Sequence, residues 1–313
     1  MKRTELLDGI KVLDLSHRLP GPYCAYILAG LGASVTKIED QKFGDPFNDG
    51  MFAKMEESFK SWYHRLNDRK KIVKLDFNSS DDSAKIMEEI KKSQIIVLGP
   101  PQKIREKLKL TQNDLEKIKN SGEKVFLELL ASSKETQSMH DINALAEIGM
   151  LGLHARAQKN ALWIDPPFLP VAGLGFGNHI STTALAGLIK AKKENNMQFI
   201  NCYLMDSAEE LFSPFWSEEL KDKKVNKFLH NGRYPCYSIY PTKDDQFVAL
   251  AAVEEKFWVR FCQKFNLNLT PEERFFYQDD RVFKLLAKTF CEKNSTEIKE
   301  IRGEEDLCLS LFN

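Results

Sequence analysis

Residues 10–39 have the sequence IKVLDLSHRLPGPYCAYILAGLGASVTKIE, and this stretch decides the fold. The apolar run 10–15, which contains β-branched residues, predicts a short strand. Residues 21–32 predict a helix, because Pro22 favours its first turn and glycines mark its end. Residues 34–39 predict a second strand. A strand, a helix and a strand in this order form one βαβ unit.

The same alternation continues over the next hundred residues. Strands are predicted for IVKLDF (72–77), QIIVLG (94–99) and KVFLELL (124–130), and helices for DDSAKIMEEIKKS (81–93) and TQNDLEKIKNSG (111–122). Alternating strands and helices predict an α/β fold, in which helices cover both faces of a parallel sheet and ligands bind beyond the carboxyl ends of the strands. No GxGxxG motif follows the first strand, so a nicotinamide dinucleotide site is not expected.

The rest of the chain extends this pattern and then changes it. Residues 182–193 predict a helix of small side chains, and residues 197–212 predict a strand that runs into a helix. The charged stretch SEELKDKKVNK (217–227) indicates a linker. After it, two strands around the turn TKDDQ and a helix from about Glu255 predict a smaller unit. The predicted division is a Rossmann-like large domain over 1–200, a helical linker over 201–230 and a smaller α+β domain over 231–313.

Composition excludes several classes of function. Lys plus Arg and Asp plus Glu balance at 45 each, so no overall field attracts nucleic acid or an anionic membrane. No apolar run has the length or character of a signal peptide or a membrane span. The cysteines lack zinc-ligand spacing, which predicts free thiols in a reducing, cytoplasmic setting. They are Cys24, Cys202, Cys236, Cys262, Cys291 and Cys308.

A His-Asp pair follows the strand predicted at 124–130. In SMHDINALAEIGML (138–151), His140 and Asp141 lie at the start of a predicted helix. His140 is either an acid/base group or an ordinary polar residue at a strand-to-helix junction, with Asp141 as the helix N-cap. The local residues leave both interpretations open.

Six blocks of the chain together resemble the family III CoA-transferases, which include formyl-CoA transferase and α-methylacyl-CoA racemase. They occur in the order of the family and extend over nearly the whole chain, and HDIN and AAVEEKFW are more similar to the racemase branch. The blocks are GIKVLDLSHRLPGPYCAYILAGLGASVTKIE (9–39), LNDRKKIVKLDF (66–77), HDINALAEIGML (140–151), VAGLGFGNHISTTALAGLI (171–189), INCYLMDSA (200–208) and YSIYPTKDDQFVALAAVEEKFW (237–258).

The resemblance implies an architecture and a ligand. A Rossmann-like large domain and a smaller domain reached by a long linker are expected, with two chains interlocked as a homodimer. A coenzyme A thioester is the expected substrate, in lipid metabolism. No covalently bound cofactor, metal, nucleic acid or membrane span is expected.

The resemblance also implies two catalytic residues. His140 takes the position of the racemases' His acid/base, and the positive end of a helix would disfavour its imidazolium form. Glu254 matches an acidic residue of the racemases' small domain that lies near this His across the dimer. Its other interpretation is a glutamate favoured at a helix N-terminus.

Four cations are the expected contacts for coenzyme A. Arg69, Lys70 and Lys71 match a basic block of the family and would bind the phosphates, or else form a solvated charge run. Arg18 stands beside His17, which replaces the arginine usual before LPGP, and would substitute for it.

Other family positions are changed. The racemases carry an Asp before the Gly-rich helix, in a pattern like ADFAGGG, and alignment without gaps places Ala172 there. Asp165 or His179 would supply the missing group only through a different loop path, and both are otherwise surface polar residues. Asp40 and Pro101 replace family arginines. The segment that returns to the large domain in the family is also expected to be missing after GEEDLCLSLFN.

These features support three hypotheses of different classes. The first is an α-methylacyl-CoA racemase-like enzyme that removes and returns the proton at the alpha carbon of a CoA thioester. The second is a catalytically degenerate family member that acts as a binding or partner protein, because Ala172 replaces the expected Asp. The third is CoA transfer between carboxylic acids, which needs an acyl-accepting aspartate at that same position.

Overall fold

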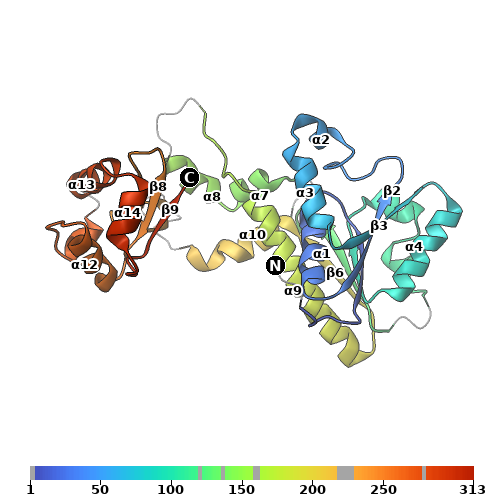
Figure 1. Cartoon of the computed structure of the whole chain (residues 1–313). Helices are drawn as coiled ribbons and strands as arrows, with labels where there is room; N and C mark the ends of the chain where they lie inside the picture. The colour runs from blue at the N-terminus through green and yellow to red at the C-terminus, as the bar shows by residue number, and fades with distance from the viewer. Residues whose placement is uncertain (1–3, 119–121, 135–137, 158–162, 217–228, 277–279) are drawn as a thin grey trace. The chain divides into compact units, whose positions relative to one another are not determined.

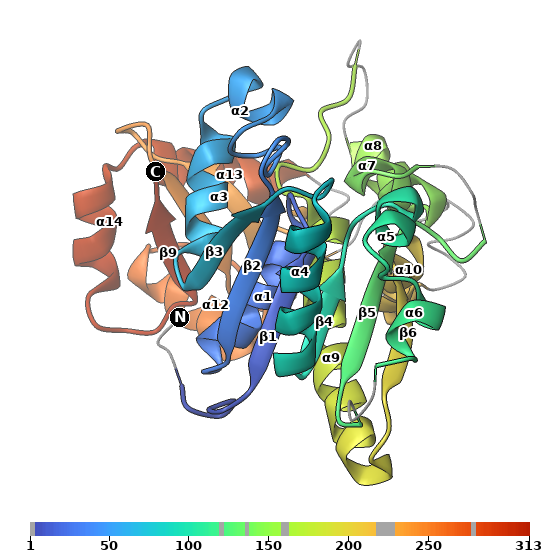
Figure 2. The ribbon, with the colours of Figure 1, turned by 90° about the vertical axis from the view of Figure 1, so that its right-hand side faces the viewer.

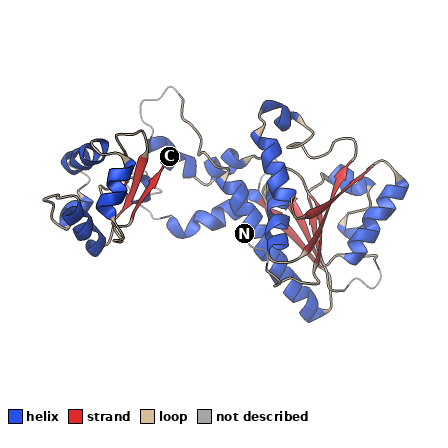
Figure 3. Ribbon diagram, viewed as in Figure 1, coloured by secondary structure: helices blue, strands red, loops and turns tan. Residues whose placement is uncertain are grey.

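A computed structural model describes residues 4–118, 122–134, 138–157, 163–216, 229–276 and 280–313 (Figure 1). The chain divides into two compact units, Met1–Trp216 and Ser217–Asn313. Each unit has its own sheet, as the strands in Figure 3 show.

The first unit is built on a six-stranded parallel sheet with the order β3-β2-β1-β4-β5-β6 (Figure 2). From β1 the chain adds β2 and β3 on one side, and then β4, β5 and β6 on the other side, so the switch point lies between β1 and β4. Open α/β sheets bind their ligands at such a switch point. The α/β prediction is therefore confirmed. The strands are β1 (Lys11–Leu15), β2 (Ser34–Asp40), β3 (Lys70–Leu75), β4 (Ile95–Leu98), β5 (Val125–Leu130) and β6 (Gln198–Tyr203).

Helices cover both faces of this sheet. On one face, α1 (Pro20–Gly30) and α9 (Val171–Glu194) bury small and aliphatic side chains against alternate strand residues such as Val12, Val97 and Leu127. On the other, α4 (Ser80–Lys92) packs against a second apolar cluster that contains Leu13, Ile96 and Phe126. Two cores on opposite faces explain why the central strands β4 and β5 are almost continuously apolar.

Local chemistry sets the ends of α4. The side chain of Ser79 accepts a hydrogen bond from the Asp82 N–H, and Asp81 and Asp82 stand in the first turn. Lys91 and Lys92 occupy the last turn. Acids at the start and cations at the end complement the helix dipole, which explains why the sequence signal for this helix was clear.

Two predicted helices have different limits in the structure. The helix predicted over 111–122 is only α6 (Gln112–Leu115) in the part that is described, with residues 119–121 outside it. The helix predicted over 182–193 is longer, because α9 also includes the Gly-rich segment from Val171. Its glycines let it approach the sheet closely: a Cβ on Gly187 would lie 2.7 Å from Val125 Cγ2.

The second unit is a three-stranded antiparallel sheet covered on one face by helices. Trp258, Phe261 and Phe290 are fully buried in its core. β9 (Leu309–Phe312) pairs with β8, although no strand was expected there from the sequence. The other elements are β7 (Tyr237–Pro241), β8 (Phe247–Ala251), α12 (Glu255–Lys264), α13 (Asp280–Cys291) and α14 (Ser295–Arg302).

The compact first unit extends past residue 200. After β6, α10 (Leu204–Phe212) packs on α9 and buries Leu204, Met205 and Ala208, so this part of the predicted linker 201–230 belongs to the first unit. The charged stretch predicted as a linker falls almost wholly on 217–228, which lie outside the described residues. No described helix combines the length and apolar character needed to traverse a membrane.

Candidate active site

A cavity of about 490 Å³ lies beyond the carboxyl ends of β1, β4 and β5. Three helices point their N-termini at it: α1, α7 (Asp141–Glu147) and α9. All of its lining residues belong to the first unit. The cavity therefore occupies the position at which parallel α/β sheets bind ligands.

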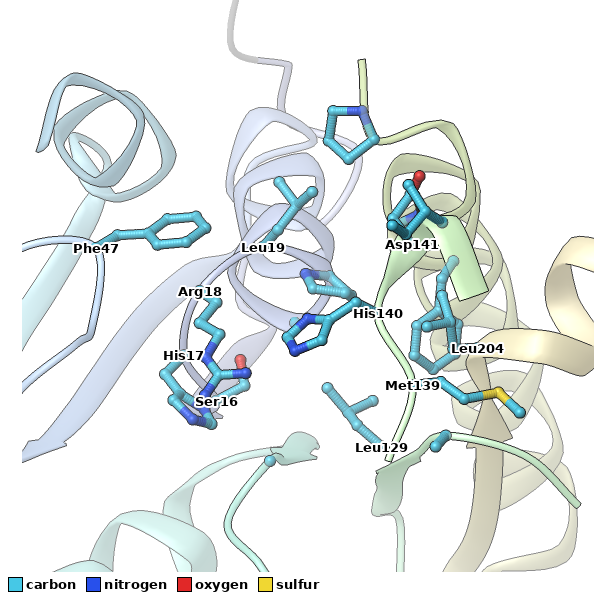
Figure 4. A pocket seen from close by; sticks show the side chains of 18 of the residues that line it. Ser16, His17, Arg18, Leu19, Phe47, Leu129, Met139, His140, Asp141 and Leu204 are labelled. Atoms are coloured by element: carbon cyan, nitrogen blue, oxygen red, sulfur yellow. Dashed lines mark hydrogen bonds between the residues drawn. The ribbon is translucent and has the colours of Figure 1, made fainter. Parts of the chain in front are cut away.

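His140 lines this cavity from the N-cap position of α7. Its backbone N–H donates to Asn143 Oδ1 at 3.0 Å, which fixes the first turn of the helix. The imidazole is exposed and projects toward the loop of Ser16, His17 and Arg18 (Figure 4). The ring is thus placed to meet a molecule bound in the cavity.

Asp141 also lines the cavity, but it does not cap its own helix as expected. Its Oδ1 accepts a hydrogen bond of 2.7 Å from the backbone N–H of Gly173, in the first turn of α9. Burial raises the pKa of the Asp141 carboxyl, against the opposing effect of the Gly173 and Ala172 N–H groups. The carboxylate therefore joins two helix starts at one wall of the cavity.

Ala172, which aligns with the family's aspartate, does not line the cavity. It is fully buried in the core between α9 and the sheet, and its neighbour Gly173 lines the cavity instead. Neither residue carries a carboxylate, so the first turn of α9 does not supply the expected group.

The loop after β1 forms the opposite side of the site. Ser16 Oγ donates to buried Asp14 at 2.5 Å, and Lys37 Nζ donates to the Ser16 carbonyl at 2.5 Å. Asp45 accepts from the Arg18 N–H at 3.1 and 3.2 Å. Buried charges beneath the cavity therefore fix the backbone of this loop.

His17 and Arg18 carry the polar chemistry of that loop. Burial and the neighbouring Arg18 lower the pKa of His17, so its ring is neutral at physiological pH. The Arg18 guanidinium lies 5.7 Å from the centre of the Phe52 ring. Arg18 was expected to contact the ligand, and it lines the cavity.

An aromatic wall, defined here as Phe47, Phe52, Phe59 and Trp62, lines the cavity from the segment that contains α2 (Met51–Met55) and α3 (Ser58–Asn67). The ring centres of Phe47 and Phe59 are 4.9 Å apart, and those of Phe59 and Trp62 are 5.5 Å apart. This wall was not expected from the sequence. The feature of the sequence that could have indicated it is the presence of four large aromatic residues within sixteen positions of an otherwise polar stretch.

Comparison with known proteins shows the family to which the chain belongs. The model of CoA-transferase family III matches residues 7–313. This chain belongs to that family. Members of this family use CoA thioesters as substrates.

Individual relatives support the assignment. The chain is 24% identical to a CaiB/baiF CoA-transferase family protein of Caenorhabditis elegans, over 97% of this chain and 85% of that protein. It is also 24% identical to the α-methylacyl-CoA racemase of Homo sapiens, over 97% of this chain and 77% of the racemase. A CAIB/BAIF family protein from Brucella suis has the same fold, with a TM-score of 0.75, 17% identity, and coverage of 96% and 82%.

The basic block of this family III chain, Arg69, Lys70 and Lys71, was expected to bind the phosphates of coenzyme A. Lys70 is buried, and its Nζ donates to Asp14 at 3.0 Å and to the Pro22 carbonyl at 2.8 Å. Its assignment to a CoA phosphate is contradicted, because this ammonium is used inside the protein. Lys71 is exposed, and Arg69 lies over the Tyr26 ring at 5.5 Å. Neither lines the large cavity.

A second cavity of about 190 Å³ shares Ser16 and His17 with the first. Asp40 and Pro101, which replace family arginines, both line it. Lys107 lines it as well and donates to the side chain of Asn78. Lys107 was not among the ligand contacts expected from the sequence, because its helix α5 (Gln102–Lys107) carries no family motif.

The remaining candidates lie away from the large cavity. His179 Nδ1 is 3.3 Å from Glu210 Oε2, and Asp165 is exposed; neither lines the cavity. Glu254 is the exposed N-cap of α12 in the second unit, so its catalytic role stays a prediction. Among the described residues, no group of three or more His, Cys, Asp or Glu side chains is placed to hold a metal ion.

Proposed function

We propose that this protein is an α-methylacyl-CoA racemase-like enzyme, which removes and returns the proton at the alpha carbon of a CoA thioester. The observation that carries the proposal is the position of His140, at a helix start and directed into the cavity at the carboxyl ends of the sheet. The likeness to the human racemase over nearly the whole chain supports it.

The surroundings of His140 suit this chemistry. Loss of the alpha proton places negative charge on the thioester oxygen, which nearby cations and oriented N–H groups stabilise. Arg18 and the N-termini of α1 and α7 face the same cavity. His140 serves as one acid/base, and these groups favour the enolate that forms when it takes the proton.

The aromatic wall indicates an apolar acyl group. Its four rings, together with Pro166, Pro167 and Phe168, give the cavity a mostly apolar lining beside the polar loop. Burying such a chain against these rings supplies binding free energy of roughly 25 cal/mol per Å² of apolar surface. We therefore assign the acyl group to this wall.

The coenzyme A part is assigned to four other cations of the first unit. Arg18 lines the large cavity and Lys107 the small one, and Arg69 and Lys71 lie on the first unit outside the large cavity. Lys70 is left out because it pairs with Asp14. The homodimer stays a prediction from the resemblance, and the cytoplasmic location stays a prediction from the cysteines.

Deuterium exchange tests the proposal. Purified protein incubated with a 2-methylacyl-CoA in heavy water is expected to incorporate deuterium at the alpha carbon and to interconvert the two enantiomers. The His140→Gln variant should racemise about 10²- to 10⁴-fold more slowly, because one proton-transfer group is lost. Absence of exchange by the unmodified protein, over several acyl chain lengths, would contradict the function.

The second candidate is a degenerate family member that binds a ligand or a partner without turnover. Gly173 favours it, since this residue presents no carboxylate to the cavity. Calorimetric titration with CoA and an acyl-CoA separates the two: ligand binding or partner-dependent activity without exchange by the pure protein supports the second candidate. Tight binding together with turnover excludes it.

CoA transfer between carboxylic acids has less support. That mechanism passes through an acyl-aspartate anhydride, and the position expected for the aspartate is Ala172. Trapping of an acylated carboxylate by hydroxylamine or borohydride in the presence of an acyl-CoA would favour transfer over racemisation.

A further inference from the structure

Racemisation needs two acid/base groups, because a proton leaves one face of the alpha carbon and another arrives on the opposite face. The titratable side chains that line the large cavity, within the residues described, are His17, Arg18, His140 and Asp141. Asp141 is the one carboxyl group among these lining residues. The question is whether its position fits the second role.

The backbone of Gly173 holds the Asp141 carboxylate at this wall. A Cβ built on Gly173 would lie 3.6 Å from Asp141 Oδ1 and 3.1 Å from Leu19 Cδ2. Asp141 Oδ1 is already 2.7 Å from the Gly173 nitrogen. A carboxyl group from α7 therefore stands next to the place where a side chain from α9 would begin.

The backbone gives His140 and Asp141 different directions of approach. His140 is the N-cap of α7 and Asp141 its first helical residue. His140 has extended backbone dihedrals (φ −108°, ψ 175°), whereas Asp141 is helical, so the two side chains leave the backbone in different directions (Figure 4). Two neighbouring residues can thus reach one bound molecule from different sides while the helix start holds both in place.

We propose that Asp141 is the second acid/base of this site and acts on the face of the alpha carbon opposite His140. The inference rests on the proposed racemase function and identifies the group that the changed Gly-rich segment no longer supplies. It assigns a chemical role to a carboxyl group that otherwise serves only as a cap for α9.

The proton balance follows from these two groups. Neutral His140 takes the alpha proton, the C–H electron pair forms the enolate double bond, and the carbonyl pair moves to the thioester oxygen. Protonated Asp141 then donates its proton to the other face of the carbon, and the carbonyl re-forms. The protein is left with an imidazolium and a carboxylate, which either catalyse the reverse reaction or exchange protons with solvent.

The electrostatics of Asp141 agree with a donor role. Burial raises the pKa of this carboxyl, which increases the fraction that carries a proton. The N–H groups of Gly173 and Ala172 lower this pKa in part, because they favour the carboxylate. A group used in both directions of racemisation needs both states.

Two substitutions separate the chemical role from the capping role. Asp141→Asn keeps a side-chain oxygen that can accept from the Gly173 N–H but removes the exchangeable proton. His140→Gln removes the other group. Glu147→Gln, on an exposed position of the same helix, is the matched control.

Each variant is incubated separately with the R and the S form of a 2-methylacyl-CoA in heavy water. Asp141→Asn is expected to lose racemisation by about 10²-fold or more but to exchange the alpha proton of one form. His140→Gln is expected to exchange the alpha proton of the other form. Glu147→Gln should behave like the unmodified protein.

The outcomes distinguish this inference from the proposed function. If the unmodified protein exchanges both forms and Asp141→Asn still racemises normally, or slows both forms equally, Asp141 is only a cap. If the unmodified protein exchanges neither form, the proposed function itself fails. If Asp141→Asn does not fold, the His140→Gln variant decides. Exchange of the alpha proton of one form by His140→Gln requires a second acid/base group. If His140→Gln exchanges the alpha proton of neither form, the inference is overturned.

Discussion

Arg18 has φ of +65°, a left-handed backbone conformation that non-glycine residues rarely adopt. Asp45 stabilises it by accepting hydrogen bonds from the Arg18 N–H, and Asp45 is in turn 3.3 Å from the ammonium of Lys37. Such strain persists only where the surrounding structure outweighs it, and it is frequent at functional sites. In this protein it places a guanidinium at the wall of the cavity.

This strain predicts a difference between two substitutions of Arg18. Arg18→Ala and Arg18→Gly both remove the guanidinium, so both should weaken acyl-CoA turnover. The glycine variant should be more stable by about 0.5–1 kcal/mol, since relief of about 1–2 kcal/mol of Cβ strain exceeds the entropy cost of glycine. Urea unfolding of the pair measures the difference. Equal stabilities would mean that Arg18 is not strained.

At the scale of elements, α9 connects the site to the core. Its first turn meets Asp141 through Gly173, and its middle turns lie on β5 and β6. At Gly187 an added Cβ would come within 2.7 Å of Val125 Cγ2 and 2.9 Å of Ile200 Cδ1. Close packing of this helix on the sheet therefore fixes the wall that carries the candidate acid/base.

Gly187→Ala tests this close approach. The extra methyl should destabilise the protein by about 1–3 kcal/mol, because the helix must move off two branched strand residues. Gly152→Ala, in α8 (Met150–Ala157), is the control, since nothing lies within 4 Å of its added Cβ.

The control substitution should have the opposite sign. Gly152→Ala gains helix propensity and is expected to stabilise the protein by roughly 0.5–1 kcal/mol. Thermal or urea unfolding of both variants provides the measurement. A stabilising effect at Gly187 would show that α9 is free to shift on the sheet.

At the scale of the whole molecule, buried charge is concentrated under the cavity. Asp14 and Lys70 pair at 3.0 Å, and Lys37 lies 3.3 Å from Asp45. Burial by itself raises the pKa of Asp14, but Lys70, Lys37 and Ser16 outweigh it and hold the value at about 2. The charge of Lys70 is therefore used for stability and for shaping the loop of the site.

The Asp14 pair predicts how stability depends on pH. Because the pKa of folded Asp14 is below its ordinary value of 3.8, its contribution is complete above that value. It is lost as the pH falls to about 2, and amounts to roughly 2 kcal/mol. Urea unfolding at several pH values between about 5 and about 2 measures the slope.

Asp14→Asn should remove this contribution to the slope. The variant should also lose about 3–5 kcal/mol at neutral pH, because Lys70 is left buried without its partner. Asp8→Asn, at an exposed position, is the control and should keep the slope of the unmodified protein. If Asp14→Asn keeps that slope as well, another carboxylate accounts for acid unfolding.

The sequence by itself determined the succession of strands and helices in the first unit, because β-branched runs, helix caps and glycines act over neighbouring residues. It also determined the family, since short blocks in a fixed order carry that information. It did not determine α9 from Val171 or strand β9, because Gly-rich and short C-terminal segments have weak local preferences and gain their structure by packing.

The tertiary structure alone decided which polar groups meet. Lys70 pairs with Asp14 across 56 positions, and Gly173 meets Asp141 across 32, distances over which local patterns carry no information. The buried pair removes Lys70 from the ligand, whereas the short approach of α9 brings a carboxyl group to the cavity of His140. Both outcomes follow from the parallel sheet, which gathers the ends of strands far apart in sequence at one edge.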